Sequence, residues 1–567
     1  MFSLKAVLLC VVCYTLAPSL GQTSDTAEPS RTPQDGPVTV SPSGQFRGSW
    51  MTSRRGRQFQ AYRGIRYAQP PVGELRFQPP KLIETYPEEV DASEDGPACP
   101  LLAPPGTPLD EDCLNVNVYT PNNNSSKPLP VIVFIHPGGF YSFSSRSNVF
   151  GPHYLLDKDV VLVTINYRLG TLGFLSTGDE LAPGNNGFKD QVAALRWVRR
   201  NIRAFGGDPE LVTLTGYSAG STSVVLHMMS PMSKGLFHRA ISNSASPVGK
   251  EPLGQDLYSL AVRQAEILNC PTDNSTVIVA CLKTKPWQEL GRSLLGFYEF
   301  GYDPVTIWKP IVEKDFGQER FLDVQPEDAI RGGKLLTPVP HIVSQTTDEF
   351  FWKAFTVLKN DTLLKQMNEN WNRIAPISFQ LPRENASIPA ERLRQVYLGG
   401  RALVRGDVTS ARGLGKLYGD SIVGFRVHRL ANLMSRHSPH KVFYYEFSYI
   451  GNHSFYEDPE TSRPTGAAHH DDLLYLFSIG FRFPLVPADG SQDSVMVDRM
   501  TGLWYNFARF GDPNPRGADQ PELSSVHWPA MTPQERQYLR IGDQLTVQAK
   551  LGEDRFRVWE ELYPMEY

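Results

Sequence analysis

The stretch LVTLTGYSAGSTSVVLHMM, residues 211–229, decides the fold. LVTLT (211–215) is apolar and β-branched, which predicts a buried strand, and the run from Ser221 to Met229 predicts a helix. Between them lies GYSAG (216–220), a G-x-S-x-G pattern in the strand–turn–helix context that a nucleophile elbow requires. The bare pattern is weak evidence, because a Gly-flanked loop serine would match it too. The context carries the prediction that Ser218 is a nucleophile.

The residues before this stretch predict more elements of the same kind. VIVFIH (131–136) and VVLVTINY (160–167) are almost continuously apolar, as strands buried on both faces of a parallel sheet are. Residues 190–207 have apolar side chains at helical spacing, with Asp190 at the predicted start and Gly206 at the predicted end. Strands that alternate with helices predict an α/β fold, with a large, mostly parallel sheet covered by helices on both faces. Past residue 250 the pattern assigns elements only loosely.

Acyl transfer also needs donors for the oxygen that becomes negative in the tetrahedral intermediate. HPGGF (136–140) follows a predicted strand, and Gly138 and Gly139 can turn two backbone N–H groups toward one point. The N–H of Ala219, directly after the nucleophile, supplies a third. These three residues are the predicted oxyanion hole. The alternative for the two glycines is a plain turn.

The N-terminus has the features of an export signal, with Lys5, a short apolar run, and small residues before a cut at Gln22. We therefore predict a signal peptide over 1–21 and, because 22–37 is polar and rich in Pro, Ser and Thr, a flexible arm there. No later stretch is long and apolar enough to predict a membrane anchor. The mature protein is expected to be secreted and extracellular.

The mature chain keeps four cysteines, which allow three pairings. The short local loops, Cys99–Cys113 and Cys270–Cys281, are the natural choice in an oxidising compartment, and the alternative is four buried free thiols. Sequons for N-glycosylation lie in polar contexts that are typical of surface loops. They occur at Asn123, Asn124, Asn274, Asn360, Asn385 and Asn452.

The charge pattern argues against nucleic acid as a partner. The 567 residues carry a formal net charge of −4, with no Lys/Arg-rich block. The histidines lack H-E-x-x-H spacing, so no metal site is expected, and the predicted chemistry needs no cofactor. The expected partner is a small-molecule ester, and the sequence does not indicate an oligomeric state.

Many stretches together resemble the type-B carboxylesterase family, which includes cholinesterases, juvenile hormone esterases and neuroligin-like adhesion proteins. Within the family, the chain resembles the secreted insect-type carboxylesterases. The resemblance implies one α/β-hydrolase domain over 38–567, although the length alone would suggest several domains, and it supports both local disulfides. The matching stretches are YRGIRYAQPPVGELRF (62–77), EDCLNVNVYTP (111–121), HPGGF, NYRLGTLGFL (166–175), GNNGFKDQ (184–191), FGGDPELVTLTGYSAG (205–220), GLFHRAISNSAS (235–246), GAAHHDDLLYLF (466–477) and WYNFARFGDPNP (504–515).

The resemblance also implies the base and the acid of a catalytic triad. In GAAHHDDL the catalytic histidine of the family matches His469, and without the resemblance His470 would be nearly as good a choice. The Asp-Glu-Gly triplet of the family matches residues 348–350, which makes Glu349 the acid. Phe350 replaces the glycine, so Asp348 remains the alternative, and a solvated acidic pair is the other interpretation of both. The implied activity is serine ester hydrolysis through an acyl-enzyme.

Two absences bear on the substrate. Cholinesterases have an acidic residue before the nucleophile and an aromatic cation site in the first disulfide loop. This chain has Tyr217 there, and its loop PLLAPPGTPLDED has no aromatic residue, which disfavours acetylcholine. Juvenile hormone esterases usually have Gln in place of Tyr217.

Aromatic residues beside the site motifs either line an apolar gorge or belong to the core: Phe140, Tyr141, Phe143, Phe350, Phe351 and Trp352. A gorge of this kind favours small to medium apolar esters. The rival hypothesis is a catalytically inactive adhesion or scaffold protein on the same fold.

Overall fold

The computed structural model describes residues 36–121, 127–458, 460–515, 521–524 and 526–567. The predicted signal peptide, nearly all of the predicted arm and the sequons at Asn123 and Asn124 lie outside these residues. In the described part of the chain, no helix has the length and apolar character needed to cross a membrane.

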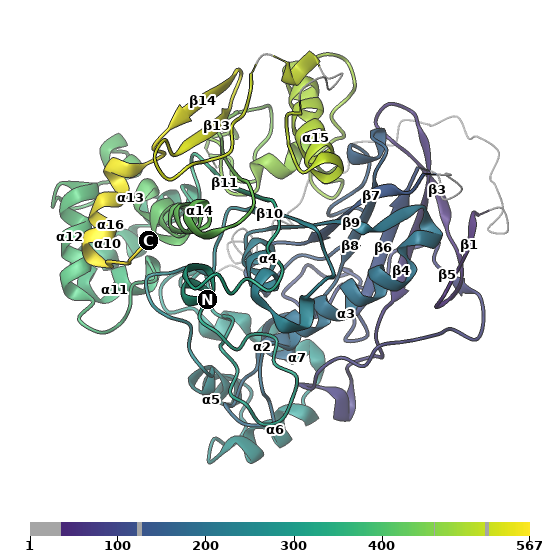
Figure 1. Cartoon of the computed structure of the whole chain (residues 1–567). Helices are drawn as coiled ribbons and strands as arrows, with labels where there is room; N and C mark the ends of the chain where they lie inside the picture. Colours follow the sequence, from purple (N-terminus) through teal and green to yellow (C-terminus); the bar gives the residue numbers. More distant parts are fainter. Residues whose placement is uncertain (1–35, 122–126, 459, 516–520, 525) are drawn as a thin grey trace.

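Within the described residues, eleven strands form one sheet in the order β14-β13-β12-β11-β10-β9-β7-β8-β6-β4-β3 (Figure 1). From β8 to β13 all neighbouring strands are parallel, and the pairings at both ends of the sheet are antiparallel. The prediction of a mostly parallel sheet is therefore confirmed. A separate small sheet joins β1, β2 and β5. The strands are β1 (Val38–Ser41), β2 (Gly44–Arg47), β3 (Ser49–Thr52), β4 (Gln58–Arg66), β5 (Val90–Asp91), β6 (Asn115–Thr120), β7 (Leu129–Ile135), β8 (Val161–Ile165), β9 (Gly207–Tyr217), β10 (Arg239–Asn243), β11 (His341–Thr346), β12 (Val442–Phe447), β13 (Gln537–Ile541) and β14 (Leu545–Ala549).

The central strands are apolar throughout because each face of the sheet carries its own core. In β7, Val131, Val133 and Ile135 belong to one hydrophobic cluster, whereas Ile132 and Phe134 belong to another. Successive side chains of a strand point to opposite faces, so neither face of β7 meets water. This explains why VIVFIH shows no polar alternation.

Helices cover both faces, as predicted. Apolar side chains of α3, α4 and α14 belong to the same hydrophobic cluster as Val131 of β7, whereas those of α15 belong to the cluster that contains Ile132. Figure 1 shows α15 apart from α3 and α4. The helices are α2 (Gly170–Phe174), α3 (Asn186–Asn201), α4 (Ala219–Met229), α5 (Tyr258–Ile267), α6 (Ser275–Thr284), α7 (Trp287–Arg292), α8 (Pro326–Arg331), α9 (Trp352–Leu358), α10 (Asp361–Glu369), α11 (Trp371–Ser378), α12 (Ser387–Leu398), α13 (Val408–Gly419), α14 (Phe425–His437), α15 (Gln492–Phe510) and α16 (Glu553–Leu562).

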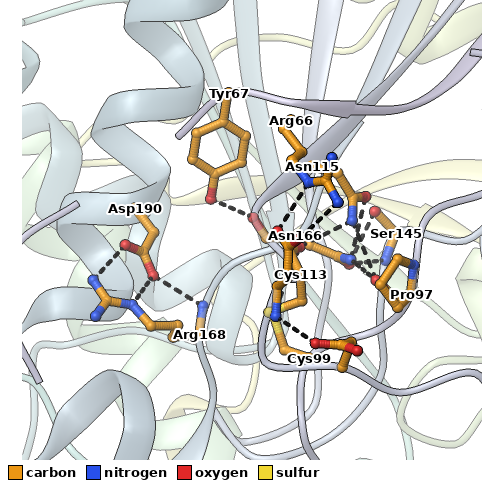
Figure 2. Close-up of a disulfide and its surroundings, with 12 residues drawn as sticks. Arg66, Tyr67, Pro97, Cys99, Cys113, Asn115, Ser145, Asn166, Arg168 and Asp190 are labelled. Atoms are coloured by element: carbon orange, nitrogen blue, oxygen red, sulfur yellow. Dashed lines mark hydrogen bonds and ion pairs between the residues drawn. A yellow bond between two sulfur atoms is a disulfide. The ribbon is translucent and has the colours of Figure 1, made fainter. Parts of the chain in front are cut away.

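The predicted start of the helix over 190–207 is wrong, because α3 begins one turn earlier, at Asn186. Asp190 does not cap it. Its buried carboxylate accepts hydrogen bonds from the Arg168 guanidinium at 2.7 Å, a pair that Figure 2 shows. A short 3₁₀ turn continues the helix to Phe205, and Gly206, with φ of 83°, ends it as predicted.

The structure contains both local disulfides, with Cα atoms 5.0 Å apart in Cys99–Cys113 and 5.8 Å apart in Cys270–Cys281. The first lies beside a buried network in which the side-chain amides of Asn115 and Asn166 donate to the carbonyl oxygen of Pro97 (Figure 2). The cross-link therefore adjoins the start of β6 in the central sheet.

We expect the paired substitution Cys99→Ser/Cys113→Ser to lower the free energy of unfolding by roughly 3 kcal/mol, because it removes a 14-residue constraint from the unfolded chain. Urea unfolding of the purified, disulfide-intact protein measures this change. Peptide mapping without reduction should find both local cross-links. Crossed pairings, or an unchanged unfolding midpoint, would contradict the expectation.

Four predicted glycosylation sites lie on the surface. Asn274, Asn360, Asn385 and Asn452 are all exposed. Two of them also cap helices: the side chain of Asn274 accepts from the N–H of Val277 at the start of α6, and that of Asn360 accepts from two N–H groups at the start of α10. Their attachment to glycans stays a prediction.

Candidate active site

The predicted site residues come from the carboxyl ends of neighbouring parallel strands. Ser218 follows β9, Gly138 and Gly139 follow β7, and Glu349 follows β11. In open α/β sheets ligands bind at this edge. His469 comes from the long connection after β12.

A sharp turn holds Ser218 between β9 and α4. Its backbone has φ of 53° and ψ of −117°, a region that L-residues rarely adopt, and its N–H donates to the carbonyl oxygen of Asn243 at 2.8 Å. A Cβ on Gly216 would lie 2.2 Å from the carbonyl oxygen of Gly220, and a Cβ on Gly220 would lie 2.1 Å from that of Ile135. Only glycine therefore fits at positions 216 and 220, two residues before and two residues after this serine.

The structure brings His469 and Glu349 together. The Nδ1–H of His469 donates to Oε2 of Glu349 at 2.5 Å, and the other carboxylate oxygen accepts from the N–H of Thr346 at 2.8 Å. The histidine is 1% exposed and the glutamate 4%. On the other side of the ring, Nε2 is buried with no hydrogen-bond partner among the described residues. It can accept a proton from Ser218, which lines the same cavity.

The two alternative residues, Asp348 and His470, have other hydrogen-bond partners. The Oδ1 atom of Asp348 accepts from Nζ of Lys416 at 2.9 Å, so this carboxylate is part of a separate ion pair. The backbone N–H of His470 donates to the hydroxyl of Tyr217 at 2.8 Å, and its Nδ1 lies 3.4 Å from the hydroxyl of Tyr456. No hydrogen bond between described residues joins either side chain to Ser218 or Glu349.

Phe350, which stands where the family has glycine, packs on the histidine. Its φ is 50°, in the left-handed region that glycine adopts without strain. The centroid of its ring lies 4.4 Å from that of His469. The departure from the family pattern therefore keeps the turn and adds an aromatic face against the imidazole.

Burial disfavours the charged forms of both His469 and Glu349. It lowers the pKa of His469 below its ordinary value and raises the pKa of Glu349, while the hydrogen bond from the N–H of Thr346 opposes the rise in the glutamate. The imidazole is therefore neutral at neutral pH. A neutral imidazole whose Nδ1–H is held by an acceptor presents Nε2 as the basic nitrogen.

Three backbone amides on the cavity wall are suited to an oxyanion. Gly138 and Gly139 have φ of 114° and 59°, and a Cβ on Gly138 would lie 2.1 Å from the carbonyl oxygen of Ser142. Within the described residues, the N–H groups of Gly138, Gly139 and Ala219 donate no hydrogen bond. Because buried N–H groups are normally paired, three unpaired donors beside one serine indicate a place for a negative oxygen.

The cavity has a volume of about 200 Å³ and aromatic walls. Five of the six aromatic residues that the sequence singled out line it: Phe140, Tyr141, Phe143, Phe350 and Trp352. Phe351 packs on Phe355 instead, with ring centroids 5.7 Å apart. Trp352 also stacks on Tyr456 at 4.5 Å, which gives the cavity a flat aromatic wall.

Sequence reasoning missed several contributors. The hydroxyl of Tyr217 accepts from the backbone N–H of His470, directly after His469, and its only sequence signal was its place beside Ser218. Other cavity walls come from 247–257, 298–310 and 422–426, which lie outside the stretches that the sequence analysis singled out.

Comparisons with known proteins show the family of this chain. The model of the carboxylesterase family matches residues 35–559. The chain is 35% identical to a carboxylic ester hydrolase of Bombus ignitus, with 90% of this chain and 91% of that protein covered, and 34% identical to a juvenile hormone esterase of Tribolium castaneum, with 89% and 88% covered.

A solved structure has the same fold. It is that of juvenile hormone esterase from Manduca sexta with OTFP covalently attached, and it superimposes with a TM-score of 0.81 at 27% sequence identity. The match covers 94% of this chain and all of the other.

Proposed function

We propose that this chain works through a Ser218–His469–Glu349 triad and an acyl-enzyme. The chain belongs to the carboxylesterase family and is a carboxylic ester hydrolase. The observation that carries this proposal is the cavity shared by Ser218, the unpartnered Nε2 of His469 and three unpaired backbone amides. The domain that performs the reaction is proposed to span 38–567.

Each step follows from the position of a proton. Nε2 of His469 takes the hydroxyl proton as Oγ of Ser218 attacks the ester carbonyl, and the amides of Gly138, Gly139 and Ala219 bind the oxyanion. Glu349 keeps Nδ1 protonated and stabilises the imidazolium. The imidazolium then gives its proton to the departing alcohol, and water repeats the sequence to release the acid.

The lining favours small to medium apolar esters, because aromatic walls bury an acyl or alcohol chain without leaving polar groups unpaired. We propose that such esters are the substrates and that the protein acts after secretion, as its disulfides favour an oxidising compartment. Incubating the purified protein with p-nitrophenyl butyrate and detecting butyrate tests the activity. If butyrate is released no faster than with heat-denatured protein, the proposed activity is refuted.

We expect the acidic limb of the pH profile of kcat/KM to have its midpoint below pH 6.5. His469 must be neutral to act, an unperturbed histidine would put the limb at about 6 to 7.5, and burial lowers the pKa of this one. Activity therefore rises as pH increases through the lowered pKa and is already full at neutral pH. The limb belongs to the His469–Glu349 pair, because the two groups are in direct contact.

Steady-state rates of p-nitrophenyl butyrate hydrolysis between pH 4 and 9 measure the limb. A midpoint above pH 7 would contradict the effect of burial.

A further inference from the structure

The catalytic cavity also has a cationic wall. Arg426, in the first turn of α14, and Lys309, in the connection before α8, both line the cavity that contains Ser218. The neighbouring wall comes from the loop after β10, which includes Gly249 and Glu251. Cationic side chains are unusual in the wall of a site that takes only neutral esters, because burying a charge is costly unless it is paired.

Arg426 lies near the carboxylates of Glu251 and Glu327, whose charges favour its charged form, but it pairs directly with neither in the described part of the chain. It forms no hydrogen bond and no ion pair there, and its Nε is buried without an acceptor. A nearby cation shows the contrast: Lys353 also lines the cavity, but its Nζ pairs with Asp303 at 2.6 Å and donates to the carbonyl oxygen of Tyr302. A planar guanidinium left open on a cavity wall presents its donors to an oxyanion.

The acids nearby do not balance the cations. Glu251 lines the cavity but lies 3.7 Å from Lys309, a distance typical of a weak, half-exposed pair. Glu327 accepts from the N–H of Gly249, and burial raises its pKa, which disfavours its charge. Burial lowers the pKa of Lys250, and the positive charges of Arg426 and Lys309 lower it further. Among the described residues that line the cavity here, Arg426 and Lys309 stand against a single carboxylate, that of Glu251, so this wall keeps an excess of positive charge.

We propose that this wall is a subsite for an anionic group of the substrate, so that the preferred esters carry a carboxylate away from the scissile bond. A monoester of a dicarboxylic acid is the simplest such compound. The aromatic walls would take its apolar chain, and Arg426 its free carboxylate, with Lys309 adding positive charge. The inference rests on the proposed ester hydrolysis and names the substrate class of that same cavity.

The test compares kcat/KM for mono-p-nitrophenyl esters of adipic, pimelic and suberic acids with those for p-nitrophenyl alkanoates of the same chain lengths. A second series carries the carboxylate on the alcohol, as the butyrate ester of p-hydroxyphenylpropionate against phenyl butyrate. We expect Arg426→Gln to lower the ratio of anionic to neutral kcat/KM by about tenfold or more in at least one series, since a buried charged contact is lost. Lys309→Gln should lower it less.

The matched control is Arg392→Gln, an exposed arginine whose partner is Glu561 and which should leave the ratio unchanged. In the unmodified protein the ratio should fall as ionic strength rises. A ratio within about twofold of the unmodified value in Arg426→Gln, in both series, would overturn the subsite while leaving ester hydrolysis intact.

Binding separates the two proposals if no ester is cleaved. Ser218→Ala should bind monomethyl suberate in ligand-observed NMR, and Ser218→Ala/Arg426→Gln should bind it about tenfold more weakly. Equal binding by both variants would refute the subsite without reference to catalysis. Absence of hydrolysis with weakened binding in the double variant would refute only the triad.

Discussion

Replacing Ser218 or His469 by alanine is expected to lower kcat for p-nitrophenyl butyrate by at least about a thousandfold, and replacing both is expected to cost little more. The serine has no substitute as nucleophile in the strained turn, and without the imidazole its proton has no acceptor. Because both residues act in one step, the two losses should not add. Losses that multiply in the double variant would show that they act independently.

The matched control for His469→Ala is His470→Ala, which changes the adjacent imidazole in the same cavity. Its side chain approaches the hydroxyl of Tyr456, whereas its link to Tyr217 is made by backbone that alanine keeps. We expect this variant to retain most of its activity. If His470→Ala were the inactive variant instead, the base would be misassigned by one residue.

Glu349→Gln is expected to lower kcat by about a hundredfold or more, with a smaller effect on KM. The amide has nearly the shape of the carboxylate, so packing is kept. It lacks the negative charge that stabilises the imidazolium, however, and its NH₂ group favours the wrong tautomer of His469. Circular dichroism and the unfolding midpoint would show whether the fold is preserved.

The adjacent carboxylate provides the comparison. Asp348→Asn removes a charge one residue away, but the carboxylate contacts that it changes are the partly exposed ion pair with Lys416 and the hydrogen bond from the hydroxyl of Thr347. Surface pairs of this kind contribute about 1 kcal/mol or less, so activity should stay within a fewfold of the original. If Asp348→Asn lost more activity than Glu349→Gln, the assignment of the acid would be reversed.

The parts of the fold that were predictable depend on local patterns. β7, β8, β9 and α4 follow from runs of β-branched residues and from two glycines that allow a tight turn, and these features are set by neighbours in the sequence. The two glycines after β7 were readable for the same reason. Many of the elements after residue 250 are helices of about ten residues or fewer whose packing partners are distant in sequence, so periodicity alone assigned them poorly.

Other features depend on tertiary contacts. Asp190 looked like a helix cap because an acid at a helix start usually is one, but a buried arginine from another segment outweighs that preference. The roles of His469 and Glu349 came from family resemblance, because no local rule connects residues 120 positions apart. The position of Arg426 in the cavity wall could not be predicted from the sequence, because the absence of a direct hydrogen-bond partner is a property of the tertiary structure.

The central claim is that Ser218 is an activated nucleophile, and fluorophosphonate labelling of the purified protein tests it most directly. Peptide mass spectrometry should locate a single adduct on Ser218, with no labelling of Ser218→Ala and slow labelling of His469→Ala. An adduct on another residue, or none under conditions that label a reference esterase, would contradict the account.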